Sequence, residues 1–205
     1  MLHAADCLIE AERVLNQVLD GVAPDQWRIR VPPLPTAPDP ARPTPLDALV
    51  RHHVRANAEL PDLLAGRAAD HADLAALTDL TDLEHRQDLP ALAREVSDKA
   101  CAAAAAVTDP AAPTGSDGPP AEELLWRRAV GAALMAHEVS VHRGSVNPLT
   151  EHLARALWER TEPEAARWRE LGWFGEPLTP VPVDVSWRDR FLMLAGRDPH
   201  PLWDR

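Results

Sequence analysis

The feature that most constrains the fold is the alternation of helix-forming stretches with segments rich in proline or glycine. Residues 2–19 place apolar side chains three and four positions apart, which is the spacing of one helix face, and Gly21 follows as a stop signal. Between Pro24 and Pro45 the chain carries eight prolines, which remove backbone donors and disfavour helix. We therefore expect a first helix and then an extended loop, with Trp27 packed against the helices.

The rest of the chain continues this alternation. Thr44 and Pro45 have the pattern of a helix cap and a first-turn proline, which predicts a second helix from about Pro45 to Leu64. Residues 71–83 are ambiguous because short leucine-rich turns are broken by Thr and Asp. The apolar spacing and the helix-favouring composition predict further helices over residues 89–107, 121–143 and 149–171. The proline-punctuated tail should pack back on the helices through Trp187, Phe191, Leu192, Leu194 and Trp203.

Strands are poorly supported, because the chain has no tyrosine and two phenylalanines but long stretches of Ala, Leu, Glu and Arg. We expect an all-α fold in which four amphipathic helices form a four-helix bundle with at least one crossover connection. The 205 residues fit one domain, with the bundle over about 1–147 and a C-terminal helix and packed tail over about 148–205.

Composition excludes several classes of function. The net charge of -11 argues against a non-specific nucleic-acid binder, which needs clustered basic residues. No apolar run approaches the ~18 residues of a membrane span, and Asp6, Glu10 and Glu12 do not fit a signal peptide. We therefore expect a soluble, cytoplasmic protein. Lys99 is the only lysine among many arginines, alanines and prolines, a bias typical of a high-GC bacterial genome.

The segment from His137 to His142 holds the most informative spacing. Glu138 and His142 are four residues apart, so on a helix they lie only ~40° from each other and can share a ligand. His137 and His142 are five residues apart and lie ~140° from each other, so they cannot readily bind one metal ion. This segment is therefore not the H-E-x-x-H motif of zinc proteases.

A metal ion would need at least one further ligand from another helix. The second helix offers His52 and His53, and His52 shares an apolar face with Leu49, Ala56 and Leu60. This favours His52 as the inward histidine. The spacing alone does not choose between a metal site and a satisfied core histidine beside an ordinary Glu138–His142 pair.

Three segments resemble proteins of the DinB-like and mycothiol-dependent maleylpyruvate isomerase superfamily. Residues 49–58, LVRHHVRANA, resemble the L-L-A-H-L-V-x-N-A second helix, in which the histidine falls on His52 and His53 is the fallback. Residues 138–142, EVSVH, resemble the E-x-x-V-H helix end. The tail segments LGWFGEP at 171–177 and DRFLMLAGRDP at 189–199 resemble the ending of an actinobacterial metal-binding subgroup.

This resemblance implies a DinB-like bundle with His52, Glu138 and His142 as a metal triad. Zinc is the first choice, and nickel, manganese or iron also suit such ligands. The implied function is a metal-dependent thiol transferase or isomerase in which metal-bound mycothiol attacks a small electrophile. After the triad histidine this chain reads Arg143-Gly144-Ser145, where the family commonly has Gly-Trp-Asp.

No catalytic residue follows from these patterns, but four arginines are candidates to bind a substrate carboxylate: Arg51, Arg55, Arg143 and Arg197. Two alternatives remain open. One is a metal-dependent hydrolase that activates water at the same site, which product analysis with and without thiol would distinguish. The other is a non-enzymatic protein that binds a metal or ligand. A homodimer through exposed tryptophans is a further expectation.

Overall fold

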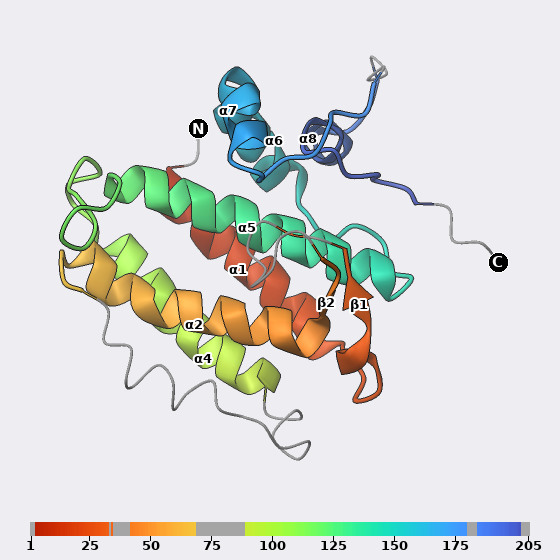
Figure 1. The fold of residues 1–205 in the computed structure, drawn as a ribbon, viewed down its shortest axis with the longest axis horizontal. Helices are drawn as coiled ribbons and strands as arrows, with labels where there is room; N and C mark the ends of the chain where they lie inside the picture. The colour runs from red at the N-terminus through yellow and green to blue at the C-terminus, as the bar shows by residue number, and fades with distance from the viewer. Residues whose placement is uncertain (1–2, 33, 35–41, 69–88, 180–183, 202–205) are drawn as a thin grey trace.

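The computed structural model describes residues 3–32, 34, 42–68, 89–179 and 184–201. Among these residues, long helices lie side by side as Figure 1 shows: α1 (Ala4–Asp20), α2 (Leu46–Leu64), α4 (Leu89–Ala105) and α5 (Ala121–His142). The strands found in this part of the chain are β1 (Arg30–Val31) and β2 (Thr44–Pro45), a short antiparallel pair. The all-α prediction is confirmed.

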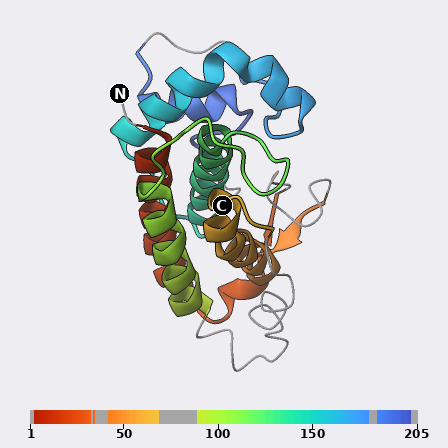
Figure 2. The ribbon, with the colours of Figure 1, turned by 90° about the vertical axis from the view of Figure 1, so that its left-hand side faces the viewer.

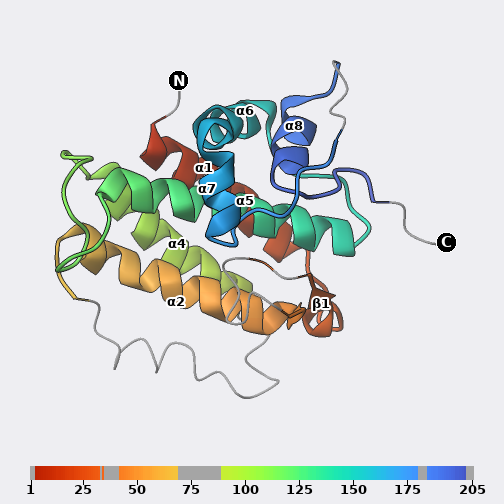
Figure 3. The ribbon, with the colours of Figure 1, turned by 45° about the horizontal axis from the view of Figure 1, so that its top comes forward.

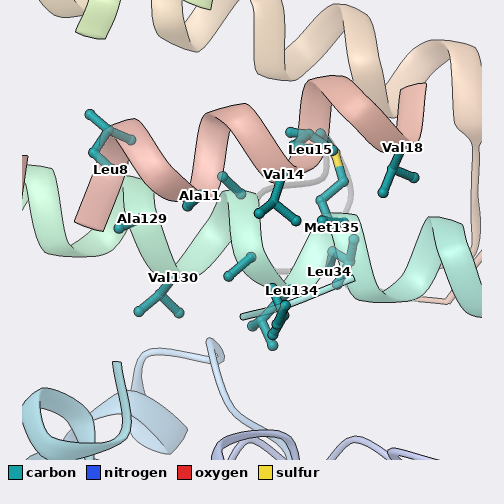
Figure 4. Packing of buried hydrophobic residues seen from close by; sticks show 14 of the residues in the cluster. Leu8, Ala11, Val14, Leu15, Val18, Leu34, Ala129, Val130, Leu134 and Met135 are labelled. Atoms are coloured by element: carbon teal, nitrogen blue, oxygen red, sulfur yellow. The ribbon is translucent and has the colours of Figure 1, made fainter. Parts of the chain in front are cut away.

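Helices α1 and α4 each pack on two of the other long helices. Helix α1 packs on α5 and α4, and α4 in turn packs on α2. Figure 2 looks nearly along α5 and α2 and shows α1 and α4 side by side. Buried side chains lie between α1 and α5, among them Leu15 and Met135 (Figure 4). The predicted first helix and the predicted helix over residues 121–143 are confirmed to within two residues.

A second group of helices covers the other side of α5. It contains α6 (Glu151–Thr161), α7 (Ala165–Glu170) and α8 (Trp187–Leu194), which lie across α5 in Figure 3. Helix α8 packs on α6 and buries Phe191 and Leu192, as predicted for the tail. With neighbours on both sides, residues 129–141 of α5 are all buried. The predicted contact of Trp203 lies outside the described residues.

The predicted helix over residues 149–171 is wrong in its length. It is divided into α6, the 3-10 turn Glu162–Glu164 and α7. Pro163 explains the break, because proline lacks an amide hydrogen and clashes with the preceding turn of a helix. The ambiguous stretch at residues 71–83 falls outside the described part of the chain.

The segment between α1 and α2 is partly as predicted. Trp27, in the 3-10 turn Gln26–Arg28, is buried as expected. Thr44 is not the cap of α2, because it belongs to β2 and its hydroxyl donates to the carbonyl oxygen of Arg42 over 3.3 Å. The helix begins at Leu46, whose amide donates to the carbonyl oxygen of Ile29. This backbone hydrogen bond to the preceding segment therefore takes the place of the predicted side-chain cap at Thr44.

Candidate functional site

The two adjacent histidines of α2 differ in burial. His53 lies on the inward face and is 7% exposed, whereas His52 is half-buried. The prediction that His52 is the inward histidine is therefore wrong. The reason is that Val50 and Val54 belong to the buried stripe together with Leu49, which shifts the centre of that stripe to His53.

The predicted pair on α5 is formed. The carboxylate Oε2 of Glu138 lies 3.7 Å from Nδ1 of His142. The same nitrogen lies 2.8 Å from the backbone carbonyl oxygen of Glu138, to which it can donate. Four-residue spacing therefore brings the two side chains together on the face that sequence analysis predicted.

The tail supplies an unpredicted partner to Glu138. Arg197, which follows α8, places its guanidinium 3.3 Å from Oε1 of Glu138. Burial raises the pKa of Glu138, and the positive charges of Arg197 and His142 only partly oppose that shift. The ring of the neighbouring His137 contacts the backbone carbonyl oxygen of Asp198 at 3.2 Å. Burial lowers the pKa of His137 to about 4, so it is uncharged at neutral pH.

The predicted metal triad is not assembled. The described residues, which include His52, Glu138 and His142, contain no group of three or more His, Cys, Asp or Glu side chains that could hold a metal ion. A carboxylate oxygen of Glu138 is instead engaged by Arg197. These three residues therefore do not fit a metal ion in this arrangement.

The space between the long helices instead contains a buried polar cluster. We call it the Glu12 cluster and define it as Glu12, His53, Asn57 and Ser97. Its residues come from α1, α2 and α4, and each is less than a tenth exposed. Glu12 accepts a hydrogen bond from the hydroxyl of Ser97 over 3.0 Å and lies 3.1 Å from Nε2 of His53. Burial opposes ionisation of Glu12, but the charge of His53 and hydrogen bonds from the other three residues lower its pKa.

Arg128 of α5 is a further charged residue that sequence analysis missed. It is partly buried, and among the described residues it makes no hydrogen bond and no close ion pair. Burial lowers its pKa, while the carboxylates of Glu59 and Glu12 act in the opposite direction. Its charge also acts on His52, whose pKa is lowered by burial first and by Arg128 second. Arg128 therefore places a positive charge near His52, and the lowered pKa of His52 favours its neutral imidazole.

Besides Arg197, which pairs with Glu138, the arginines predicted to bind substrate have different surroundings. Arg143 donates to Gln26 Oε1 over 3.1 Å and to the carbonyl oxygens of Val18 and Gly21, so it caps the end of α1. Arg55 is exposed and pairs with Glu59 at 3.4 Å. Arg51 is half-buried on α2.

Neither cysteine is suited to be a nucleophile. Burial raises the pKa of Cys7 to about 12, and burial together with the charge of Glu12 raises that of Cys101 to about 11. Because the thiolate is the reactive form, both are inert at neutral pH. Cys7 is fully buried and packs as a small hydrophobic side chain.

None of the described helices is long and apolar enough to cross a membrane. A scan against protein-family models finds no match, and neither does a search of curated proteins or of solved structures.

Proposed function

We propose that the chain is a DinB-like protein that transfers a low-molecular-weight thiol, such as mycothiol, to a small acidic electrophile, or uses the thiol to isomerise it. The reaction class comes from the sequence resemblance, and the packing of α1, α2, α4 and α5 is compatible with a DinB-like four-helix bundle. The observation that carries the proposal is Arg128, a partly buried guanidinium with no hydrogen-bond partner among the described residues.

Arg128 would bind the acidic group of the substrate. A guanidinium removed from water is costly unless it meets an anion, and its planar donors match a carboxylate. His52 lies close enough for the charge of Arg128 to help lower its pKa. An uncharged imidazole can accept the proton that a thiol must lose before its sulfur attacks.

The resemblance also implies a divalent metal, with zinc first and nickel, manganese or iron as alternatives. A metal of this kind lowers the pKa of a bound thiol. Because His52, Glu138 and His142 are not brought together among the described residues, we assign no step of the reaction to a metal at that triad.

The test is an assay of the full chain with small electrophiles that carry a carboxylate, such as maleylpyruvate, with and without mycothiol. We expect thiol-dependent loss of substrate. Arg128→Gln should raise KM by about 10- to 100-fold, because a hydrogen bond to a charged group contributes roughly 1.5–3 kcal/mol. The matched control is Arg127→Gln on the same helix, where Arg127 pairs with Glu123, and its KM should be unchanged.

Each other outcome has a distinct meaning. Turnover without thiol would contradict the transferase and identify a hydrolase. Binding of the acidic compound without turnover would identify a ligand-binding protein. Equal KM values for the two arginine variants would remove Arg128 from the site.

A further inference from the structure

In the Glu12 cluster one nitrogen, Nε2 of His53, has three close polar neighbours. Nε2 of His53 lies 3.0 and 3.1 Å from the two carboxylate oxygens of Glu12, and 3.0 Å from Nδ2 of Asn57. Nε2 carries one hydrogen in the imidazolium and in one neutral tautomer, and one lone pair in the other neutral tautomer. If Nε2 carries the hydrogen, it faces the amide hydrogens of Asn57 in this orientation of the amide. If it carries the lone pair, no hydrogen separates it from the carboxylate.

The same cluster contains buried acceptors that are poorly satisfied. Oδ1 of Asn57 has no hydrogen-bond partner among the described residues, and Oε1 of Glu12 has only the 3.0 Å contact with Nε2 of His53, which lacks hydrogen-bond geometry. Both side chains are 1% exposed. Buried polar atoms are nearly always satisfied, and an exception calls for a specific explanation such as an ion. The unsatisfied atoms and the crowded nitrogen belong to side chains in mutual contact.

We propose that Glu12, His53, Asn57 and Ser97 form a divalent-cation site that joins α1, α2 and α4. A cation would accept the lone pair of Nε2 and the charge of the carboxylate at once, which removes the conflict at His53. The amide of Asn57 would present Oδ1, since the oxygen and nitrogen of an amide are exchanged by a half-turn of the side chain. The hydroxyl oxygen of Ser97 would be the fourth ligand.

The spacing of the four side chains fits such a site. Two donors that each lie ~2.1 Å from a metal, at right angles, are ~3.0 Å apart. The contacts of Glu12 with His53 and Ser97, and of His53 with Asn57, are all 3.0 or 3.1 Å. These donor-to-donor distances fit a metal ion whose ligands lie at right angles, as in an octahedral site, and they also lie in the range of ordinary hydrogen bonds.

The donor set indicates which cation would bind. One imidazole nitrogen with carboxylate, amide and hydroxyl oxygens suits Zn²⁺, Mn²⁺ or Fe²⁺ better than Ca²⁺, which prefers oxygen ligands alone. Because each ligand is less than a tenth exposed, the site is closed and structural. This inference does not depend on the proposed thiol chemistry, and it uses none of His52, Glu138 or His142.

The test is metal binding by the full chain without a polyhistidine tag. A buried site fills as the helices assemble, so the chain is refolded with Co²⁺ and freed of excess metal by gel filtration. We expect about one Co²⁺ per chain by elemental analysis in wild type, with a visible absorption band. His53→Ala should lose both, whereas the adjacent His52→Ala and the distant His142→Ala should keep both.

A second variant covers the case in which His53→Ala does not fold. Asn57→Asp adds a carboxylate, so it should bind Co²⁺ at least tenfold more tightly and refold better with Co²⁺ than with a chelator. Metal-free wild type after refolding would overturn the proposal, as would retention of metal by folded His53→Ala. Loss of metal in His142→Ala alone would overturn it in favour of the pair on α5. A metal affinity that Asn57→Asp leaves unchanged would also contradict it.

Discussion

Two glutamates, Glu12 and Glu138, are buried to a similar degree, but their pKa values are shifted in opposite directions. Glu12 is 1% exposed and Glu138 is 5% exposed. The pKa of Glu12 is lowered, because the charge of His53 and hydrogen bonds from three side chains outweigh burial. The pKa of Glu138 is raised, because burial outweighs the charges of Arg197 at 3.3 Å and His142 at 3.7 Å.

The difference shows that burial alone does not decide the direction in which the pKa of a carboxylate shifts. Glu12 lies between packed helices and its partners come from α2 and α4, whereas Glu138 lies beneath a tail segment that provides one guanidinium. Several donors stabilise the charged form more than one ion pair does. Glu12, whose pKa is lowered, is the better candidate for a site that needs a permanent negative charge.

The largest effect should come from removing the partner of the charged glutamate. His53→Ala leaves Glu12 buried without its main partner, and we expect a loss of about 3–5 kcal/mol in the free energy of unfolding. His52→Ala, next to it and half-buried, should lose less than about 1 kcal/mol. Urea unfolding with a chelator present measures both. Equal losses would show that His53 is not the specific partner.

The next effect is on the acid limb of stability. The folded pKa of Glu12 is below its ordinary value of 4.5, so its contribution is present above pH 4.5 and is lost as pH falls through the lower folded pKa. Glu12→Gln should therefore lose about 2 kcal/mol at pH 7 and show a smaller further loss in acid. Urea unfolding between pH 7 and 3 tests this. If Glu12→Gln lost as much stability between pH 7 and 3 as wild type does, the lowered pKa of Glu12 would be contradicted.

Glu138→Gln should show a smaller effect with the opposite trend. The folded pKa of Glu138 is raised, so its contribution is present below 4.5 and is lost as pH rises through the folded pKa. At pH 7 the variant should lie within about 1 kcal/mol of wild type, and its stability relative to wild type should improve as pH rises. The same pH series measures it. A relative stability that declines with rising pH would remove the contrast with Glu12.

The smallest effect should come from a cap outside both regions. Arg143→Ala removes donors from the end of α1 and should cost about 1 kcal/mol, or roughly 2–4 °C in Tm. The control is Arg67→Ala, which removes an exposed ion pair with Asp62 and should cost less than about 0.5 kcal/mol. Thermal unfolding of both variants tests whether Arg143 is structural. A KM effect without a Tm effect would restore Arg143 as a ligand-binding candidate.

Sequence patterns predicted the regular parts of the fold well. Apolar periodicity found α1 because its buried face follows the helix repeat without a break. Helix α5 was found from its helix-favouring composition and its end signals, since residues 129–141 are buried on every side. The sequence pattern predicted α6 and α7 as one helix, because helix-favouring residues continue on both sides of Pro163. The structure shows that this proline breaks the helix. The capping pattern at Thr44 failed because a strand pairing depends on a distant segment.

The candidate site was predictable only where its residues are close in sequence. The Glu138–His142 pair follows from four-residue spacing, whereas the contact with Arg197 depends on how the tail docks. Glu12 left a signal, since it is the one polar residue in the apolar stripe of the first helix. No local pattern separates Arg128 from the exposed arginines, because its burial depends on the arrangement of neighbouring helices.

The most direct test of the account is the position of bound metal in crystals of the full chain grown with Zn²⁺, located by anomalous scattering at the zinc edge. The account predicts a peak between Glu12 and His53, with Asn57 and Ser97 as the remaining ligands. A peak between Glu138 and His142 would contradict it and support the triad implied by the resemblance. Crystals without a peak among the long helices would show that the Glu12 cluster is held by hydrogen bonds alone.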